Sequence, residues 1–336
     1  AYLNEKFPQR KGTEVTSFLP LDGGFSKKTV LFDIADGAGT RESLVMRAEH
    51  GVNLCCYDGS EVTQEFYMIR LMRQAGLPIA EPLWLEDDAS RLGARFIVSR
   101  KAIGKTYGGN FGAKEAISPA LLQSVIDTFI PIHTLRVAAP DPLVLKSHLK
   151  EWLPYKTVSE ARRHHVCFSL PKVIDRTNIR MPPQLRRALK WLERNIPDCD
   201  EPPAIVHIDY AFNNLIIDGD EVSAVLDWES SRLGDPAEDI VWTQQTLAAQ
   251  ISLPEFLARY EAGTGRRISS YRIAYNRVAK CALNAITFHS SLRAIEKYQI
   301  PNIKMSTLGL KYMALLGANF NELIEAAENV RRDDGA

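Results

Sequence analysis

Acidic and amide side chains stand at both ends of a short hairpin pattern near the middle of the chain. Asp209 and Asn214 precede one apolar run, residues 218–220 are Asp-Gly-Asp, and a second apolar run leads to Asp227. An Asp-Gly pair between apolar runs is typical of a β-hairpin. Asn214 and Asp227 are therefore expected at the same open end of this hairpin, with Asp209 a few residues upstream.

This combination of residues suits the chemistry of phosphate. An amide oxygen beside a carboxylate can bind Mg²⁺, which usually takes one or two carboxylates and keeps positions for water and phosphate oxygens. A separate carboxylate, here Asp209, can accept a hydroxyl proton as that hydroxyl attacks phosphorus. The residues alone indicate a candidate phosphoryl-transfer site, although Asp and Asn also commonly cap and turn a plain surface hairpin.

A longer motif surrounds the hairpin. Residues 207–214 are HIDYAFNN, which has the form HxDxxxxN, and residues 227–239 are DWESSRLGDPAED. In this order and spacing they resemble the aminoglycoside phosphotransferase and choline kinase-like family, nearest to the modules related to those fused to acyl-CoA dehydrogenases. The resemblance implies an α+β, protein-kinase-like two-lobe fold with a small antiparallel-sheet N-terminal lobe and a mainly helical C-terminal lobe.

The same resemblance implies roles for individual residues. Asp209 would orient and deprotonate the acceptor hydroxyl, while Asn214 and Asp227 would hold Mg²⁺ against the phosphates of ATP or GTP. Three further residues are implied to support the site: His207, Glu229 and Asp239. For the histidine we favour a structural brace over a catalytic group. Glu229 fits a site residue and a local hydrogen-bonding anchor equally well.

A glycine-rich turn near the N-terminus extends the resemblance. It resembles the family's phosphate-covering turn between the first two strands, where glycines let the backbone approach phosphate oxygens. The nucleotide-binding residues expected in this turn are Gly23, Gly24, Phe25 and Ser26. In isolation the same turn would be interpreted as an ordinary hairpin.

Two more segments of the N-terminal region resemble nucleotide-binding parts of the family. Arg47 falls where the third strand normally presents a lysine to the phosphates, and Glu65, on the next helix, falls where its ion-pair partner is expected. The two could instead form a plain structural ion pair. Residues 96–104 resemble the hinge that binds the nucleotide base through its backbone, with Ser99 and Lys101 as the expected contacts.

Two positions depart from the family's usual residues. The guanidinium of Arg47 stays charged and can bind a phosphate and a carboxylate at the same time. Its length and geometry differ from those of a lysine ammonium, and this difference puts the affinity for nucleotide in question. Some branches, including the modules fused to acyl-CoA dehydrogenases, also carry arginine there. Ile208 replaces the glycine commonest in aminoglycoside-type motifs. Because kinase-like relatives carry Arg or Asn at that position, we expect that no glycine conformation is required.

The pattern of apolar residues predicts the elements that would position these side chains. Strands are expected at residues 14–21, 28–34, 42–47, 80–86 and 94–100. Apolar residues at helical spacing predict a helix from Val62 to Ala75 that stops at Gly76. Later helices are expected at 121–136, 184–195, 271–295 and 304–332, around one β island at 204–228. We expect two domains, a nucleotide-binding lobe at 1–100 and a catalytic, substrate-binding helical lobe at 101–336.

Composition narrows the class of protein. The 336 residues carry 41 basic and 41 acidic side chains, and 45% are hydrophobic, which favours an ordinary globular chain without nucleic acid or membrane as an obligatory partner. The five cysteines lack zinc-type spacing and are expected to be reduced thiols. No apolar run is long enough for a bilayer span or a signal core, so a cytoplasmic protein is expected.

Adjacent His164 and His165 lack further ligands nearby and are expected on a solvated helix face.

Three functions are compatible with these features. The leading one is a Mg²⁺-dependent kinase that moves the γ-phosphoryl group of ATP or GTP to a hydroxyl of a small molecule. The second, suggested by Arg47, is a catalytically weak nucleotide-binding pseudoenzyme or regulatory module. The third is a metal-dependent hydrolase that uses His207, Asp209 and Asp227. The sequence leaves the oligomeric state open, and the acceptor too: aminoglycoside, choline, sugar, amino alcohol or hydroxyacyl thioester.

Overall fold

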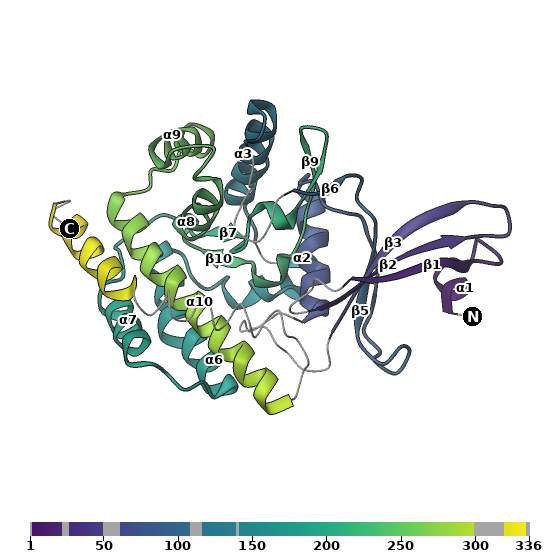
Figure 1. Ribbon diagram of the computed structural model, residues 1–336, viewed down its shortest axis with the longest axis horizontal. Helices are drawn as coiled ribbons and strands as arrows, with labels where there is room; N and C mark the ends of the chain where they lie inside the picture. The colour runs from purple at the N-terminus through teal and green to yellow at the C-terminus, as the bar shows by residue number, and fades with distance from the viewer. Residues whose placement is uncertain are drawn as a thin grey trace.

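The chain forms an antiparallel sheet followed by a mainly helical region (Figure 1). The computed structural model describes residues 2–21, 27–49, 61–107, 116–138, 141–298 and 319–333. In Figure 1 the sheet and the N-terminus lie on the right, and most helices and the C-terminus lie on the left. This arrangement confirms the expected α+β fold class.

The sheet has five strands in the order β1-β2-β3-β5-β4, and all neighbours are antiparallel. The bounds are β1 (Glu14–Leu21), β2 (Lys27–Ala35), β3 (Arg41–Glu49), β4 (Pro82–Glu86) and β5 (Phe96–Arg100). All five strands were expected from the sequence. Side chains alternate along β2, so that Phe32 and Ile34 enter an apolar cluster while Lys27 and Thr29 lie on the opposite face.

A helix covers each face of the sheet. On one face lies α2 (Val62–Gln74), whose Phe66 packs against Ile97 of β5. The other face is covered by α1 (Tyr2–Lys6), whose Tyr2 packs on the apolar cluster that contains Phe32. The helix α2 ends as expected before Gly76, which has a φ of +87° that glycine adopts without strain.

The remaining helices surround a larger apolar core. Their bounds are α3 (Pro119–Thr134), α4 (Pro142–Lys146), α5 (Val158–His164), α6 (Leu170–Thr177), α7 (Pro183–Arg194), α8 (Pro236–Leu247), α9 (Leu253–Thr264) and α10 (Ser270–Tyr298). The predicted helices at 121–136, 184–195 and 271–295 are confirmed as α3, α7 and α10. Of the helix predicted at 304–332, residues 319–332 are helical, and the earlier part lies outside the described residues.

Two small sheets lie among the helices and carry the hairpin. One contains β6 (Lys105–Thr106), β8 (Leu215–Asp218) and β9 (Glu221–Val225), and the other pairs β7 (Ala204–Val206) with β10 (Arg232–Gly234). The strands β7, β8 and β9 confirm the β island expected at 204–228, whereas β6 and β10 lie outside it and were not expected. The connection from the large sheet passes through Gly104, whose φ is +111° and where a Cβ atom would overlap the carbonyl of Ile217.

The structure corrects the expectation for His165. Its side chain is 6% exposed, so it does not lie on a solvated face. A π-helical turn (His165–Ser169) follows α5 and carries this residue into the interior. The neighbouring Arg162 is also buried and pairs with Glu238 of α8 at 2.9 Å. A carboxylate from a distant helix therefore balances the buried charge of Arg162.

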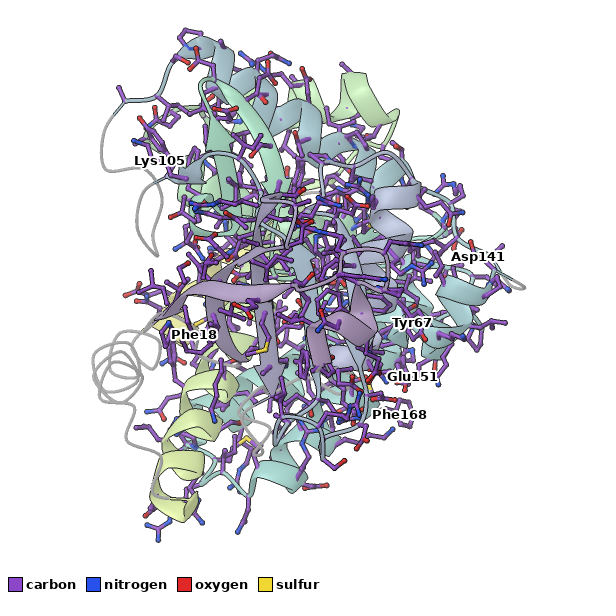
Figure 2. All side chains as sticks on the ribbon, turned by 90° about the vertical axis from the view of Figure 1, so that its right-hand side faces the viewer. Phe18, Tyr67, Lys105, Asp141, Glu151 and Phe168 are labelled. Atoms are coloured by element: carbon purple, nitrogen blue, oxygen red, sulfur yellow. The ribbon has the colours of Figure 1, made fainter. Side chains whose placement is uncertain are left out.

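Exposed apolar side chains gather on the edge strand β1. Val15, Phe18 and Leu19 are 49%, 63% and 57% exposed, and Phe18 is labelled on this strand in Figure 2. The strand has one hydrogen-bonded neighbour in the sheet, β2. Within the described ranges, none of the helices combines the length and apolar character that crossing a membrane requires.

Candidate active site

Asp239 holds the start of the candidate catalytic loop, which runs from His207 to Asn214 after β7. The carboxylate of Asp239, in the first turn of α8, accepts hydrogen bonds from the backbone N–H groups of His207 (2.6 Å) and Ile208 (2.5 Å). The Nε2 atom of His133, on α3, lies 3.1 Å from the same carboxylate. One buried anion therefore fixes the backbone of the loop through charge-assisted hydrogen bonds.

The imidazole ring of His207 is engaged by the backbone at both nitrogens. Its Nε2 donates to the carbonyl of Leu226 at 2.9 Å, and its Nδ1 accepts from the N–H of Asp209 at 3.2 Å. Burial lowers the pKa of His207, so the ring is neutral near pH 7. This geometry fits a brace between the loop and the hairpin, and it disfavours a hydrolase in which His207 would bind a metal.

The backbone of Ile208 is left-handed, with a φ of +75°. The expectation that no glycine-like conformation is required at this position was therefore wrong. A β-branched residue is strained in this region, so other contacts must hold it. Asp239 accepts from the N–H of Ile208, and Lys280 of α10 donates from Nζ to its carbonyl at 2.8 Å. Burial of the isoleucine side chain also stabilises this conformation by removing apolar surface from water.

Asn214 is hydrogen-bonded to Asp209. Its Nδ2 donates to Oδ2 of Asp209 at 2.8 Å and to the backbone carbonyl of Asp209 at 2.9 Å. Burial raises the pKa of Asp209 to about 6, while Lys280 and Asn214 oppose the rise. The carboxylate is thus ionised at neutral pH, is held in one orientation, and can accept a proton.

The hairpin brings Asn214 and Asp227 to one edge, as expected from the sequence. Leu215 pairs with Val225 in the β8–β9 ladder, and the N–H of Leu226 donates to the carbonyl of Asn214 at 2.8 Å. Asp227 follows with a φ of +66°, which turns the chain out of the strand. An amide and a carboxylate therefore emerge at the end of the same hairpin.

Two cations of the large sheet reach this edge. The Nη2 atom of Arg47 lies 2.9 Å from Oδ1 of Asp227 and 3.2 Å from Oε1 of Glu65. The Nζ atom of Lys27 lies 3.0 Å from Oε2 of Glu229. The predicted Arg47–Glu65 ion pair is confirmed as a contact, and its role toward nucleotide stays a prediction.

One buried donor of this network, Nε of Arg47, fits an anionic ligand. Within the described part of the chain, Nε of Arg47 and Oε2 of Glu65 are buried without a hydrogen-bond partner. Burial, with Glu229 and Asp227 nearby, raises the pKa of Glu65 above its ordinary range, against the opposing effect of Arg47. Unpaired buried polar atoms are costly, and a phosphate oxygen would satisfy the Arg47 donor. The residues at the hairpin end also fit Mg²⁺, since amide and carboxylate oxygens are its preferred ligands.

The expected hinge lies at the end of β5. Ser99 pairs with Val45 of β3 and Pro82 of β4. The N–H of Lys101 donates to the carbonyl of Ser43 at 2.9 Å, so in this conformation that N–H is not free to bind a nucleotide base. The expected turn residues lie outside the described residues: Gly23, Gly24, Phe25 and Ser26. Nucleotide contact stays a prediction for all six positions.

Three residues that contact the site residues were not assigned to the site from the sequence: Lys27, His133 and Lys280. His133 is buried on the inner face of α3, and its ring also contacts Asp239. Lys280 lies in a long helix without a motif, 4.2 Å from the ring centre of Trp242, and no local signal marks it. The signal for Lys27 was available, because it directly follows the glycine-rich turn.

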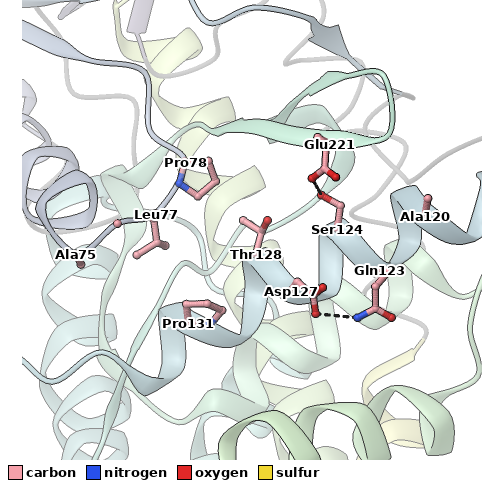
Figure 3. A pocket seen from close by; sticks show the side chains of 11 residues that line it. Ala75, Leu77, Pro78, Ala120, Gln123, Ser124, Asp127, Thr128, Pro131 and Glu221 are labelled. Carbon is pink, nitrogen blue, oxygen red and sulfur yellow. Dashed lines mark hydrogen bonds between the residues drawn. The ribbon is translucent and has the colours of Figure 1, made fainter.

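A cavity of about 590 Å³ lies away from these residues, between α3 and the connection from α2 to β4 (Figure 3). Ser124 and Glu221, joined by a hydrogen bond of 3.1 Å, line it together with Pro78. The carbonyl of Pro78 accepts from the N–H of Val225 in β9 at 2.8 Å. The cavity therefore borders the hairpin strand but contains none of the predicted site residues.

Comparison with known families identifies the class of protein. The profile of the phosphotransferase enzyme family, APH, matches residues 17–279, which include most of the sheet, the loop and the hairpin. The chain therefore belongs to the phosphotransferase enzyme family. This result confirms the resemblance stated from the sequence motifs.

Individual relatives are distant. Acyl-CoA dehydrogenase family member 11 of Gallus gallus is 27% identical over 197 residues, or 55% of this chain but only 23% of that protein. Hygromycin-B 4-O-kinase of Escherichia coli is 28% identical over 245 residues, which cover 70% of this chain and 64% of that enzyme.

A solved structure establishes the same fold. It is a thermostable mutant of aminoglycoside phosphotransferase APH(4)-Ia in a ternary complex with AMP-PNP and hygromycin B. The likeness has a TM-score of 0.60 at 20% identity and covers 96% of both chains. The expected kinase-like architecture is thereby confirmed.

Proposed function

We propose that the protein is a small-molecule kinase that transfers the γ-phosphoryl group of ATP or GTP to a hydroxyl group. The observation that carries this proposal is the 2.8 Å hydrogen bond from Asn214 Nδ2 to Asp209 Oδ2, beside the hairpin that presents Asp227. This hydrogen bond joins the proposed base to a proposed metal ligand within the loop from His207 to Asn214. Membership of the phosphotransferase enzyme family supports the same class of reaction.

Asp209 is the proposed general base. With a pKa of about 6 it is ionised at neutral pH and accepts the proton of the acceptor hydroxyl. The hydroxyl oxygen forms a bond to the γ-phosphorus as the bond from phosphorus to the leaving diphosphate oxygen breaks. Asn214 keeps the carboxylate oriented, so positioning and charge neutralisation provide most of the acceleration.

Asn214 and Asp227 are the proposed ligands of Mg²⁺. The bound ion would neutralise charge on the β- and γ-phosphate oxygens. His207 and Asp239 are positioning residues that hold the loop through the backbone contacts described above. We also propose that residues 1–100 form a nucleotide-binding lobe and residues 101–336 a catalytic lobe, as the placement of the sheet and the helices supports.

The acceptor is proposed to be a hydroxyl-bearing small molecule. Lys280 lies close enough to Asp209 to lower the pKa of its carboxyl, so a positive charge already stands near the proposed base. The relative named hygromycin-B 4-O-kinase supports phosphorylation of a hydroxyl, although its antibiotic is not thereby proposed as the substrate of this chain.

A screen for ADP or GDP release tests the function. The protein is incubated with Mg²⁺, ATP or GTP, and a library of hydroxyl metabolites, with Asp209→Asn as the blank. At least one acceptor is expected to raise nucleoside diphosphate release in the wild type and not in the blank. Equal turnover by the wild type and Asp209→Asn would contradict the assignment of Asp209 as base.

One observation favours a second candidate, a nucleotide-binding module with weak catalysis. Arg47 contacts Asp227, so a metal at Asp227 must compete with a guanidinium at 2.9 Å. Measurable binding of Mg-ATP or Mg-GTP without diphosphate release for any acceptor would support this second function over the first.

A further inference from the structure

Lys27 lies on the same sheet face as Arg47. Thr29 of β2 pairs with Arg47 of β3, and Lys27 lies two residues before Thr29, so the two cations are diagonal neighbours on one face. Lys27 is only 4% exposed, whereas the next residue, Lys28, is exposed. Lysine is almost never fully buried unless it is paired. The burial of Lys27 therefore reflects a specific anionic environment.

Both cations face the carboxylates at the end of the hairpin. Oε2 of Glu229 lies 3.0 Å from Nζ of Lys27 and 4.0 Å from Nη2 of Arg47. Arg47 also contacts Asp227, so a metal ion bound to Asp227 would displace or weaken that contact. The contact of Lys27 with Glu229 does not involve either proposed metal ligand. The ammonium can therefore remain in place when Asp227 changes partner.

We propose that Lys27 is a phosphate-binding residue, whose ammonium is held by Glu229 and contacts the triphosphate of the nucleotide. This inference rests on the proposed kinase function and adds to it a cation from β2 rather than β3. An ammonium carries three N–H donors, so it can keep Glu229 as a partner and still donate to phosphate oxygens. Lys27 also directly follows the turn that the sequence predicts to cover the phosphates.

In this assignment Arg47 and Lys27 together take the role of the single lysine that the third strand of the family normally presents to the phosphates. Arg47 keeps its ion pair with Glu65 at 3.2 Å, which couples α2 to the sheet. Lys27 supplies the compact, mobile point charge that a guanidinium does not provide. Glu229 acts as the positioning residue for Lys27.

Calorimetric titrations with Mg-ATP, Mg-GTP and adenosine test the role of Lys27. Lys27→Met is expected to weaken binding of the preferred triphosphate about tenfold or more, as loss of a charged hydrogen bond does, and to leave adenosine affinity unchanged. Lys27→Arg keeps the charge and is expected to weaken binding less. Lys28→Met removes the neighbouring exposed ammonium and is the matched control, expected to bind like the wild type.

A double variant separates phosphate binding from a structural ion pair. Lys27→Met leaves the buried carboxylate of Glu229 without this partner. The double variant Lys27→Met/Glu229→Gln removes both charges, so that neither side chain is left as an uncompensated buried charge. Weak triphosphate binding with unchanged adenosine binding is again expected. Triphosphate affinity within twofold of wild type in the single or the double variant, or equal losses for triphosphate and adenosine, would overturn the role of Lys27 alone. A wild type that binds neither ATP nor GTP would overturn the proposed function and this inference together.

Discussion

The guanidinium of Arg47 lies 2.9 Å from the carboxylate of Asp227, although 180 residues separate the two in the chain. Arg47 belongs to the large sheet and Asp227 to the end of the β8–β9 hairpin, so this contact joins the two parts of the molecule. Glu65 shares the same guanidinium nitrogen at 3.2 Å. Arg47 thus balances carboxylates from α2 and from the hairpin at once.

Replacement of Arg47 should lower stability, because its carboxylate partners would be left with less compensating charge. Arg47→Met is expected to reduce the free energy of unfolding by about 2–4 kcal/mol, since it leaves the buried carboxylate of Glu65 without its guanidinium partner. Urea denaturation measures the change. The control is Arg259→Met in the exposed pair with Glu255, expected to cost less than about 1 kcal/mol. Equal losses for both variants would show that the Arg47 network does not stabilise the fold.

Asp209→Asn should stabilise the protein at alkaline pH while abolishing phosphoryl transfer. Burial raises the pKa of Asp209 to about 6 from an ordinary 3.8, so the folded state loses stability as pH rises from about 4 through 6 and stays destabilised above that range. At pH 8 the variant is expected to unfold with a free energy about 1–3 kcal/mol higher than the wild type. The difference should shrink as pH falls from 6 toward 4, where the wild-type carboxyl is protonated.

Denaturation at pH 8 and at pH 4 measures this difference. Asp218→Asn, in the exposed turn of the same hairpin, is the control and should change stability little at either pH. A destabilised Asp209→Asn at pH 8 would mean that hydrogen bonds of the carboxylate outweigh its desolvation.

Asp239→Ala should unfold the braced loop. The substitution leaves the backbone N–H groups of His207 and Ile208 buried without their acceptor, and it removes one support of the left-handed Ile208. A loss of about 2–5 kcal/mol is expected from two unsatisfied donors. Hydrogen exchange at these two amides should accelerate more than at amides of α9. Unchanged protection of both amides would contradict the role of Asp239 in holding this loop.

Gly104→Ala should be strongly destabilising at the connection between the two parts of the chain. The added Cβ would overlap the carbonyl of Ile217, and the φ of +111° is unfavourable for alanine. A cost of about 3 kcal/mol or more in the free energy of unfolding is expected from backbone strain and overpacking together. Gly93→Ala is the control, because Gly93 has a φ of +82° with open space around it. This substitution strains only the backbone conformation and should cost about 1–2 kcal/mol.

Much of the local structure was predictable because it is encoded within short windows. The five strands and α2 follow from apolar patterns, and Gly76 ends the helix where expected. The Asp-Gly turn fixed the β8–β9 hairpin and hence the common edge of Asn214 and Asp227. The motif at 207–214 pointed to the family that the wider comparison confirms.

The departures from prediction involve contacts between distant segments. The left-handed backbone of Ile208 is stabilised by Asp239 and by Lys280 of α10, and neither contact leaves a pattern near residue 208. His165 is buried because a π-helical turn redirects the chain into the interior, which an amphipathic pattern does not reveal.

The sequence by itself determined the elements, the hairpin and the residue types available for phosphate chemistry, since hydrogen bonding and side-chain periodicity act over a few neighbours. Only the tertiary structure decided which charges meet. Lys27 and Glu229 are 202 residues apart, and their ion pair exists because the sheet and the hairpin are packed against each other. Coulomb interactions depend on distance in space and on burial, and neither can be obtained from separation along the chain.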